Sequence, residues 1–143
     1  MSESPAVSLE SGTFQLPDGT QYIGEFARVE GVGRVRQGRG QYISLSERYN
    51  GSWRDDKMHG EGSYTFASGC LYTGSFVDGA FEGQGTYTWP DGSRYTGQWA
   101  GSKMHGEGSY TDANKVVSRG TFHNGLYDSG RSYVSLRPAS LPA

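Results

Sequence analysis

The sequence contains a single cysteine, Cys70, and this scarcity excludes two kinds of structure. One cysteine cannot form a disulfide within the chain, and it supplies too few thiolates for a cysteine-based zinc site. The N-terminal stretch, MSESPAVSLESG, lacks the basic start and the apolar core of a secretory signal. No apolar run approaches the ~20 residues of a membrane-spanning helix. We therefore expect a protein of a reducing compartment, cytoplasmic in location.

The net charge is small, and large aliphatic side chains are also scarce. The net charge is −2, so nucleic acid is not an expected partner. Because leucine and isoleucine are scarce, 10 tyrosines, 6 phenylalanines and 3 tryptophans must supply most of the buried surface. The chain also has 23 glycines, about twice the usual share. Disordered chains are poor in aromatic residues, so this composition indicates an ordered β protein rich in turns. The length suits one domain.

One nine-residue string, KMHGEGSYT, occurs twice, at 57–65 and at 103–111. The offset of 46 residues is two periods of 23, and glycine and aromatic residues recur at that period. The repeating columns are Tyr49, Tyr72 and Tyr95; Gly51, Gly74, Gly97 and Gly120; Trp53, Phe76, Trp99 and Phe122; and Tyr64, Tyr87, Tyr110 and Tyr133. The chain is therefore a tandem repeat.

The first and last copies depart from this spacing. About five extra residues fall within RVEGVGRVRQGRG in the first copy, and in the last copy DANK replaces the glycine turn. Atypical end repeats are expected, because each has only one neighbour to pack against. We predict a repeat domain over 12–133, between a flexible N-terminus, 1–11, and a flexible C-terminal tail, 134–143. Its repeats fall at about 12–39, 40–61, 62–84, 85–107 and 108–130.

Each period holds two short runs in which apolar and polar residues alternate, such as 62–66 and 71–76. Alternation of period two predicts strands, and the glycine-containing segments between them predict turns. No stretch shows a helical period. The sequence thus predicts an all-β fold: a train of β-hairpins forming one antiparallel sheet of about ten strands.

The two faces of this sheet differ. One face carries alternating rings and glycines, so we expect each ring to lie across the backbone of a neighbouring glycine. A flat single layer cannot cover its own aromatic face. It must curve, pair with another copy, accept a terminal segment or receive a partner. This predicts a binding groove.

The pattern Tyr-x-Gly-x-Trp/Phe followed by Gly-x-Gly-x-Tyr resembles the MORN repeat (membrane occupation and recognition nexus). YNGSWRDDKMHGEGSY and YTGQWAGSKMHGEGSY carry the resemblance most closely, and it extends over about residues 12–133. It implies an elongated, curved, single-layer antiparallel sheet with a non-catalytic role in scaffolding, peptide binding or membrane attachment. Members of the family occur at cilia and flagella and in protist cytoskeletons. The resemblance thus implies a cytoskeletal, ciliary or flagellar setting.

Two candidate sites follow. The first is a partner-binding groove, which would bind a helix or an extended peptide through rings of the central repeats: Trp53, Tyr72, Phe76, Tyr95 and Trp99. Simple packing of these rings against each other is the alternative. The second is the arginine-rich insertion, which would contact acidic lipid or an acidic partner through Arg28, Arg34, Arg36 and Arg39. A solvated loop or an elongated hairpin is the alternative there.

The sequence gives little support for a catalytic or a metal-binding site. The Gly-x-Gly pairs precede strands and recur every period, unlike a phosphate-binding loop, which leads into a helix. His59 and His105 occupy one repeat column four strands apart, roughly 19 Å at ~4.8 Å per strand, so they cannot share a metal ion. No nucleophile or shaped pocket accompanies Glu61. We expect no enzyme activity, no cofactor and no metal.

Three function classes therefore compete. An interaction scaffold with a peptide-binding groove is favoured, and a peripheral membrane adaptor is the alternative. A carbohydrate- or choline-binding surface repeat is disfavoured, because no secretion signal precedes the repeats. The sequence leaves a homodimer open.

Overall fold

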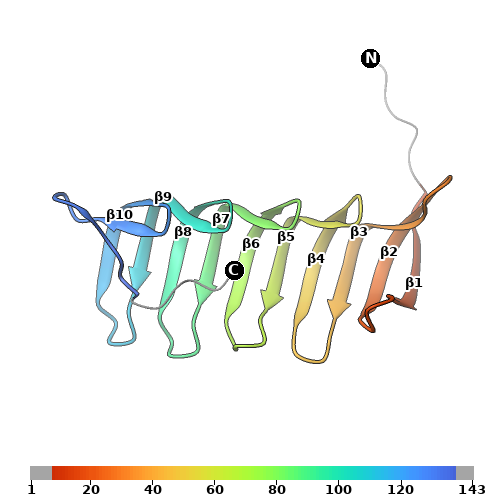
Figure 1. The fold of residues 1–143 in the computed structure, drawn as a ribbon, viewed down its shortest axis with the longest axis horizontal. Helices are drawn as coiled ribbons and strands as arrows, with labels where there is room; N and C mark the ends of the chain where they lie inside the picture. The colour runs from red at the N-terminus through yellow and green to blue at the C-terminus, as the bar shows by residue number, and fades with distance from the viewer. Residues whose placement is uncertain (1–7, 138–143) are drawn as a thin grey trace, which may run out of the picture.

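A computed structural model describes residues 8–137, and these form one open antiparallel sheet of twelve strands in chain order (Figure 1). The described residues contain no helix. The strands are β1 (Glu10–Gln15), β2 (Gln21–Val29), β3 (Gly33–Ile43), β4 (Arg48–Arg54), β5 (Lys57–Thr65), β6 (Leu71–Val77), β7 (Ala80–Thr88), β8 (Arg94–Ala100), β9 (Lys103–Thr111), β10 (Val117–His123), β11 (Leu126–Asp128) and β12 (Tyr133–Val134). The predicted elongated all-β sheet is confirmed.

Two kinds of turn alternate along the sheet. At one edge the hairpins close with two-residue turns such as Asp55-Asp56, where both residues have positive φ, 50° and 71°. Such turns twist the backbone in the sense that a hairpin needs. At the other edge longer turns place a residue with positive φ at a fixed position: Gly19, Gly69, Gly92 and Lys115. The repeat period is thus one hairpin plus one longer turn.

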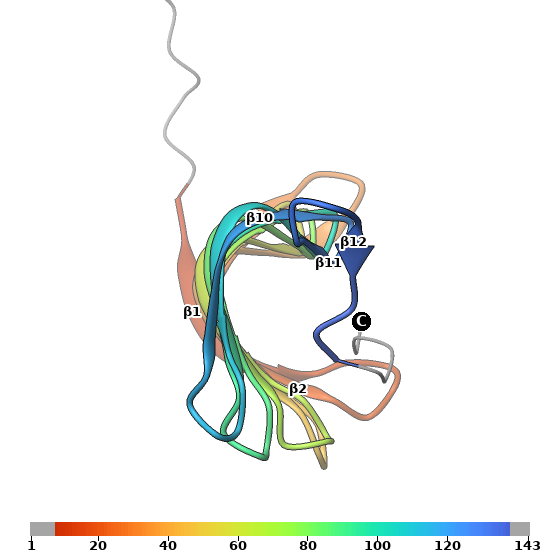
Figure 2. The same cartoon turned by 90° about the vertical axis from the view of Figure 1, so that its left-hand side faces the viewer.

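A β-bulge recurs at the same place in every central repeat. The register shifts between Gly51 and Trp53, between Gly74 and Phe76, and between Gly97 and Trp99. A bulge bends its strand and increases the local twist. Because the bulges line up, the whole sheet curls, and end-on it has a C-shaped section (Figure 2).

Each bulge is packed by a tyrosine that lies over a glycine. A Cβ added at Gly62 would meet the hydroxyl oxygen of Tyr49 at 2.4 Å, so the ring fills the space that a side chain would need. The Tyr49 hydroxyl then donates to the carbonyl of Ser52, within the bulge, at 2.7 Å. The predicted stacking of rings on glycines is confirmed, with the same arrangement at Tyr22 over Gly40, Tyr72 over Gly85 and Tyr95 over Gly108.

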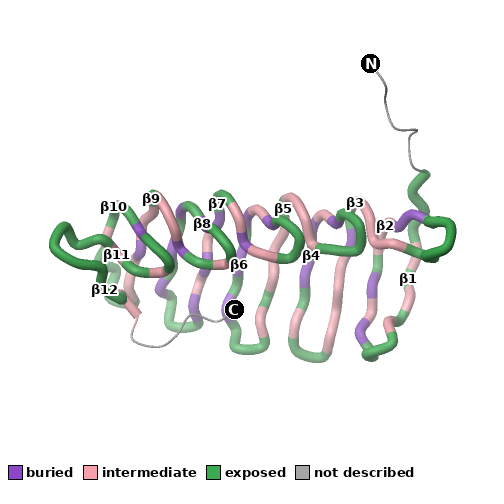
Figure 3. Tube along the Cα trace, turned by 45° about the horizontal axis from the view of Figure 1, so that its top comes forward, coloured by how far each residue is buried: buried purple, intermediate pink, exposed green. Residues whose placement is uncertain are grey.

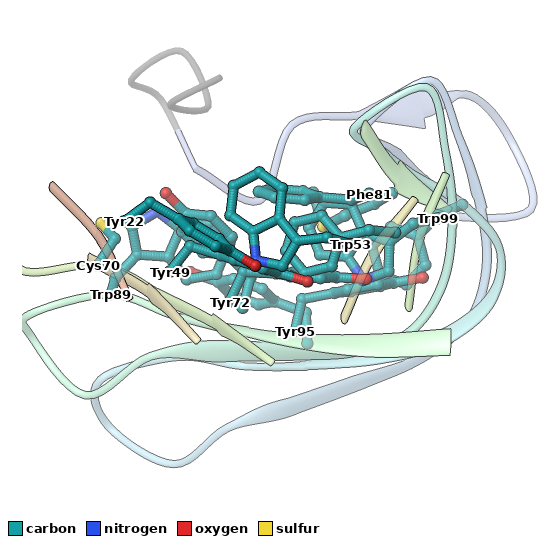
Figure 4. Close-up of a cluster of buried hydrophobic side chains, with 14 residues drawn as sticks. Tyr22, Tyr49, Trp53, Cys70, Tyr72, Phe81, Trp89, Tyr95 and Trp99 are labelled. Carbon is teal, nitrogen blue, oxygen red and sulfur yellow. The ribbon is translucent and has the colours of Figure 1, made fainter. Parts of the chain in front are cut away.

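The core is one continuous cluster on the inner face of the curl. It runs from Tyr22 to Phe122, and its rings gather inside the curve of the strands (Figure 4). Burial follows the strands, whereas the turns at the edges of the sheet are mostly exposed (Figure 3). The tight curl therefore lets a single layer bury its aromatic face.

The ends of the sheet differ from the prediction. The sheet has twelve strands in place of ten, because β11 and β12 extend it after the last full repeat. It begins at Glu10, within the segment predicted to be flexible. The tail prediction fails for 134–137, since Val134 pairs within the sheet and Arg137 is hydrogen-bonded. The remaining flexible-terminus predictions for 1–7 and 138–143 lie outside the described residues.

The arginine-rich insertion is part of the sheet. It lengthens β2 and β3 into one long hairpin, with Val29 paired to Gly33 at its tip. This was the plainer of the two predicted alternatives. None of the described residues belongs to a helix that is long and apolar enough to cross a membrane.

Candidate partner-binding groove

The inner face of the curl is open along part of its length. A cavity of about 300 Å³ is lined by Tyr42, Trp53, Met58 and Tyr64, among others. A second cavity, of about 180 Å³, shares Met58, Tyr64 and Gly79 with the first. Together these two cavities form what we call the groove, which lies against β3–β7. Its half-buried aromatic and thioether side chains are Tyr42, Met58, Tyr64 and Phe66.

The five predicted groove rings are placed differently from expectation. We expected them to remain open to a partner, but Tyr72 and Tyr95 are 0% exposed and the others at most 5%: Trp53, Phe76 and Trp99. They pack edge to face, with ring centroids 5.1 Å apart for Tyr72 and Phe76 and 5.5 Å apart for Tyr72 and Trp99. Such contacts stabilise the sheet itself. Of the five, Trp53 and Phe76 line the groove.

The side chains that do line the groove include ones that sequence reasoning missed. Met58 and Tyr64 both belong to β5, on the other arm of the repeat. Both tyrosine columns recur every 23 residues, and within its own column Tyr64 is half buried whereas Tyr87 and Tyr110 are buried, so the repeat pattern does not single out Tyr64. The contrast between Tyr49 and Tyr64 appears only when the bulge bends the strands.

One end of the groove is charged. The Arg36 guanidinium lies 4.4 Å from the ring centroid of Trp53, and its Nε donates to Asp56 Oδ1 at 2.7 Å. Burial alone would raise the pKa of the Asp56 carboxyl, but hydrogen bonds from Arg36 hold it below the ordinary value. The Arg36 side chain is only 16% exposed. This arginine is therefore a structural bridge between the long hairpin and the turn at Asp56.

The four predicted arginines do not form one surface. Arg34 lies over Phe14 at 4.2 Å, on the inner face with Arg36, whereas Arg39 reaches Ser52 on the outer face. Arg28 forms an ion pair with Glu10 at 2.7 Å. Alternation along the strands divides the set between two faces, and two of its members are already paired with carboxylates.

Several tyrosine hydroxyls place polar atoms on the inner face, and each donates a hydrogen bond. Burial raises the pKa of Tyr22, Tyr49 and Tyr95 to about 12, so each is a neutral hydrogen-bond donor at ordinary pH. Tyr64 donates to the Glu47 carboxylate at 2.6 Å. These groups orient backbone and side chains through their hydrogen bonds.

The histidines are spread along one edge. His59 lies 3.8 Å from the Asp78 carboxylate, and the rings of His105 and His123 are 5.0 Å apart. Within residues 8–137, no three His, Cys, Asp or Glu side chains come close enough together to hold a metal ion. His59 and His105 stand four strands apart, on β5 and β9.

The fold and the groove define a class: a tandem-repeat β scaffold with an open inner face. A family model described as MORN repeat matches three consecutive stretches, residues 49–71, 72–94 and 95–117. The chain therefore belongs to the MORN-repeat family. No curated protein matches it. MORN repeats are in general interaction motifs for proteins or membranes, and the proteins that they build are generally non-catalytic.

Proposed function

We propose that this chain is a non-catalytic scaffold whose groove binds a helix or an extended peptide of a partner protein. The observation that carries the proposal is the pair of adjoining cavities that share Met58, Tyr64 and Gly79. Two pockets side by side suit two neighbouring side chains of one ligand, as in helix-in-groove and extended-peptide recognition. Methionine and tyrosine adapt to such ligands, since one is flexible and the other presents both an apolar ring and a hydroxyl.

The setting that we propose is a cytoskeletal, ciliary or flagellar assembly in the cytoplasm. This part rests on the family resemblance. The buried rings Tyr72, Phe76, Tyr95 and Trp99 then have a supporting role, because they hold the curvature that keeps the groove open. A partner would contact Met58 and Tyr64 first, with Trp53 at the charged end.

The experiment compares one substitution inside the groove with one outside it on the same strand. A photoreactive amino acid at position 58 in cells of a flagellated or ciliated type would identify the partner, with position 63 as the control. Affinity for that partner is then measured for Met58→Glu and Ser63→Glu. We expect Met58→Glu to weaken binding by about tenfold or more, because a buried carboxylate is unpaired there. Equal partner affinities of the two variants, both folded, would refute the proposal that the partner binds in the groove.

A peripheral membrane adaptor remains the alternative function. One observation favours it: Arg34 and Arg39 form no ion pair with any residue in 8–137. They lie on opposite faces of the long hairpin, so only the hairpin edge would present both to acidic headgroups. Each basic residue near an anionic surface contributes ~1 kcal/mol, which makes this a weak contact by itself.

A further inference from the structure

The C-terminal segment returns across the mouth of the curl. After β12 the chain crosses the open side at the C-terminal end of the sheet (Figure 2). Leu136 packs against the aromatic cluster, and Arg137 reaches Ser93, in the turn just before β8, and Tyr110 of β9, which lie 44 and 27 residues earlier in the chain. A terminal segment therefore covers part of the inner face.

The Arg137 side chain is held by four groups, which we call the guanidinium seat. Its guanidinium carbon lies 4.1 Å from the ring centroid of Trp89. Its Nη1 donates to Ser93 Oγ at 2.6 Å and to the Tyr110 hydroxyl at 3.1 Å. The Asp91 carboxylate lies 3.8 Å from the same nitrogen. Stacking on an aromatic face combined with donation to hydroxyl groups beside a carboxylate matches a planar, delocalised cation.

The seat is built around a buried hydroxyl. Ser93 is 0% exposed, and its hydroxyl donates to Asp91 while it accepts from Arg137. The hydrogen bonds of Ser93 lower the pKa of the Asp91 carboxyl, and Arg137 lowers it further. The hydroxyl thus links the cation to a carboxylate that stays ionised. No residue of the groove described above takes part.

The seat is complete at only one turn of the described chain. In the first repeat, LPDGT at 16–20 has matching hydrogen bonds, which Thr20 donates to the Asp18 carboxylate, but Leu16 stands where the seat has Trp89. In FASGC at 66–70, Ser68 and Cys70 replace the carboxylate and the hydroxyl. The combination of Trp89, Asp91 and Ser93 is therefore a feature of one repeat and not of the repeat pattern.

We propose that this seat is a binding site for a Leu-Arg dipeptide within an extended partner peptide, and that Leu136-Arg137 occupies it in cis as a plug. The proposal rests on the proposed function and names a second contact point on the same inner face. Leu136 and Arg137, the residues that lie in the seat, show the chemistry of the ligand: an apolar side chain followed by a guanidinium group. A cavity of about 390 Å³ beside Arg137 is lined by Asp91, Asp112 and Tyr110, so the surroundings favour a basic ligand.

The plug is lightly anchored. Between the last full repeat and Leu136 stand only β11, of 3 residues, and β12, of 2. Asp91 is half exposed, so part of the ion pair is screened by water. A tethered ligand acts at a millimolar effective concentration, and a free peptide displaces it when it binds more tightly or carries further contacts. Opening of the tail would therefore set the affinity for a partner.

The test uses the full chain and a synthetic peptide with the sequence of residues 135–140, SLRPAS. Calorimetric titration compares wild type with Arg137→Ala. We expect Arg137→Ala to bind the peptide about tenfold more tightly than wild type, because its seat is empty. A peptide with alanine in place of its arginine should not bind. In the Arg137→Ala background, Asp91→Asn should weaken binding, whereas Asp18→Asn, at the matching turn without a tryptophan, should not.

Each other outcome overturns the proposal. Equal affinity for wild type and Arg137→Ala would mean that the tail is no plug, and no binding to Arg137→Ala would mean that the seat takes no external arginine. A wild-type dimer that Arg137→Ala dissociates in sedimentation would assign the seat to a second copy's tail.

In wild type itself, the Arg137 side-chain protons should show an upfield ring-current shift that Trp89→Leu removes. The hexapeptide reports on the seat alone, whereas the partner affinities of Met58→Glu and Ser63→Glu report on the groove, so failure of the seat and failure of the groove are separable.

Discussion

The ring of Tyr72 takes the space that a side chain at Gly85 would need. A Cβ at Gly85 would lie 2.2 Å from the tyrosine hydroxyl oxygen, and one at Gly74 would lie 2.4 Å from the Cα of Gly85. The tyrosine hydroxyl also donates to the Ser75 carbonyl at 2.9 Å, within the bulge. Two glycines on neighbouring strands and one tyrosine ring thus form the bend, which recurs with Tyr22, Tyr49 and Tyr95. The curl that makes the groove depends on it.

The two glycines should respond differently to alanine. Gly85→Ala meets a side chain, so we expect a loss of about 1–3 kcal/mol of unfolding free energy. Gly74→Ala meets backbone, which cannot move aside, and should cost more. In a Tyr72→Ala background the cost of Gly85→Ala should shrink, while that of Gly74→Ala should persist. Urea denaturation of the single and double variants measures both couplings.

Thr86→Ala, next to Gly85 on the same strand, is the control for that comparison. Thr86 lies on the outer face, where its hydroxyl meets that of Thr96 at 3.1 Å. Its loss should cost less than about 1 kcal/mol. Equal couplings of Tyr72 to Gly85 and Gly74 would show that the ring does not distinguish the two strands.

Alkaline pH should unfold the sheet through its tyrosines. Burial raises the pKa of Tyr22, Tyr49 and Tyr95 to about 12 from 10.0. Between these values the unfolded chain loses phenolic protons more readily than the folded one. The stability from these rings is therefore complete below about pH 10 and is lost as pH rises towards 12. Unfolding midpoints from pH 8 upwards, followed with phenolate absorbance, measure this. A flat profile from about pH 9 to 11 would contradict it.

The sequence was sufficient to predict the repeat, the strands and the ring-on-glycine contacts, because these recur at a fixed spacing and each copy supports the others. It did not predict that Tyr64 lines the groove. Tyr49 and Tyr64 each lie two residues from a glycine, and their difference in burial depends on the bulge between Gly51 and Trp53, which is a three-dimensional feature. The seat at Arg137 was also missed, since the contact joins residues 44 apart and occurs only once. A contact that occurs once does not appear in the 23-residue pattern of the sequence.

The last repeat offers a direct test of the turn geometry. Lys115 has φ 68°, at the position where the other turns have glycines with φ near 90°, and its amide donates to the Asp112 carbonyl as Gly92 donates to Trp89. A residue with a Cβ is strained in this region by about 1–2 kcal/mol. Glycine relieves the strain but gains freedom in the unfolded chain. We expect Lys115→Gly to stabilise the chain by about 0.5–1 kcal/mol.

The matched control reverses the exchange at an equivalent turn. A Cβ at Gly92 meets nothing within 4 Å, so Gly92→Lys carries only the conformational cost. It should destabilise the chain by about 1 kcal/mol or more. Thermal denaturation of both variants measures whether Lys115→Gly raises the stability and Gly92→Lys lowers it. A loss of stability in Lys115→Gly would show that the lysine side chain has a stabilising contact that outweighs its backbone strain.

Binding to acidic vesicles should depend on Arg34 and Arg39 if the chain is a membrane adaptor. Arg36 is unsuitable for this test, because its substitution would break the bridge to Asp56 and expose Trp53. Arg34→Gln with Arg39→Gln removes two charges without touching an ion pair. At ~1 kcal/mol per charge, binding to phosphatidylserine vesicles should fall by about thirtyfold.

The control double variant, Arg48→Gln with Arg54→Gln, removes the same charge from exposed positions on β4. It should lower vesicle binding less, because these residues lie outside the long hairpin. Co-sedimentation with vesicles at low and physiological salt measures both variants, and all binding should weaken as salt screens the charges. Equal losses in the two variants would mean that overall charge drives the attraction, so the long hairpin would not be a membrane site.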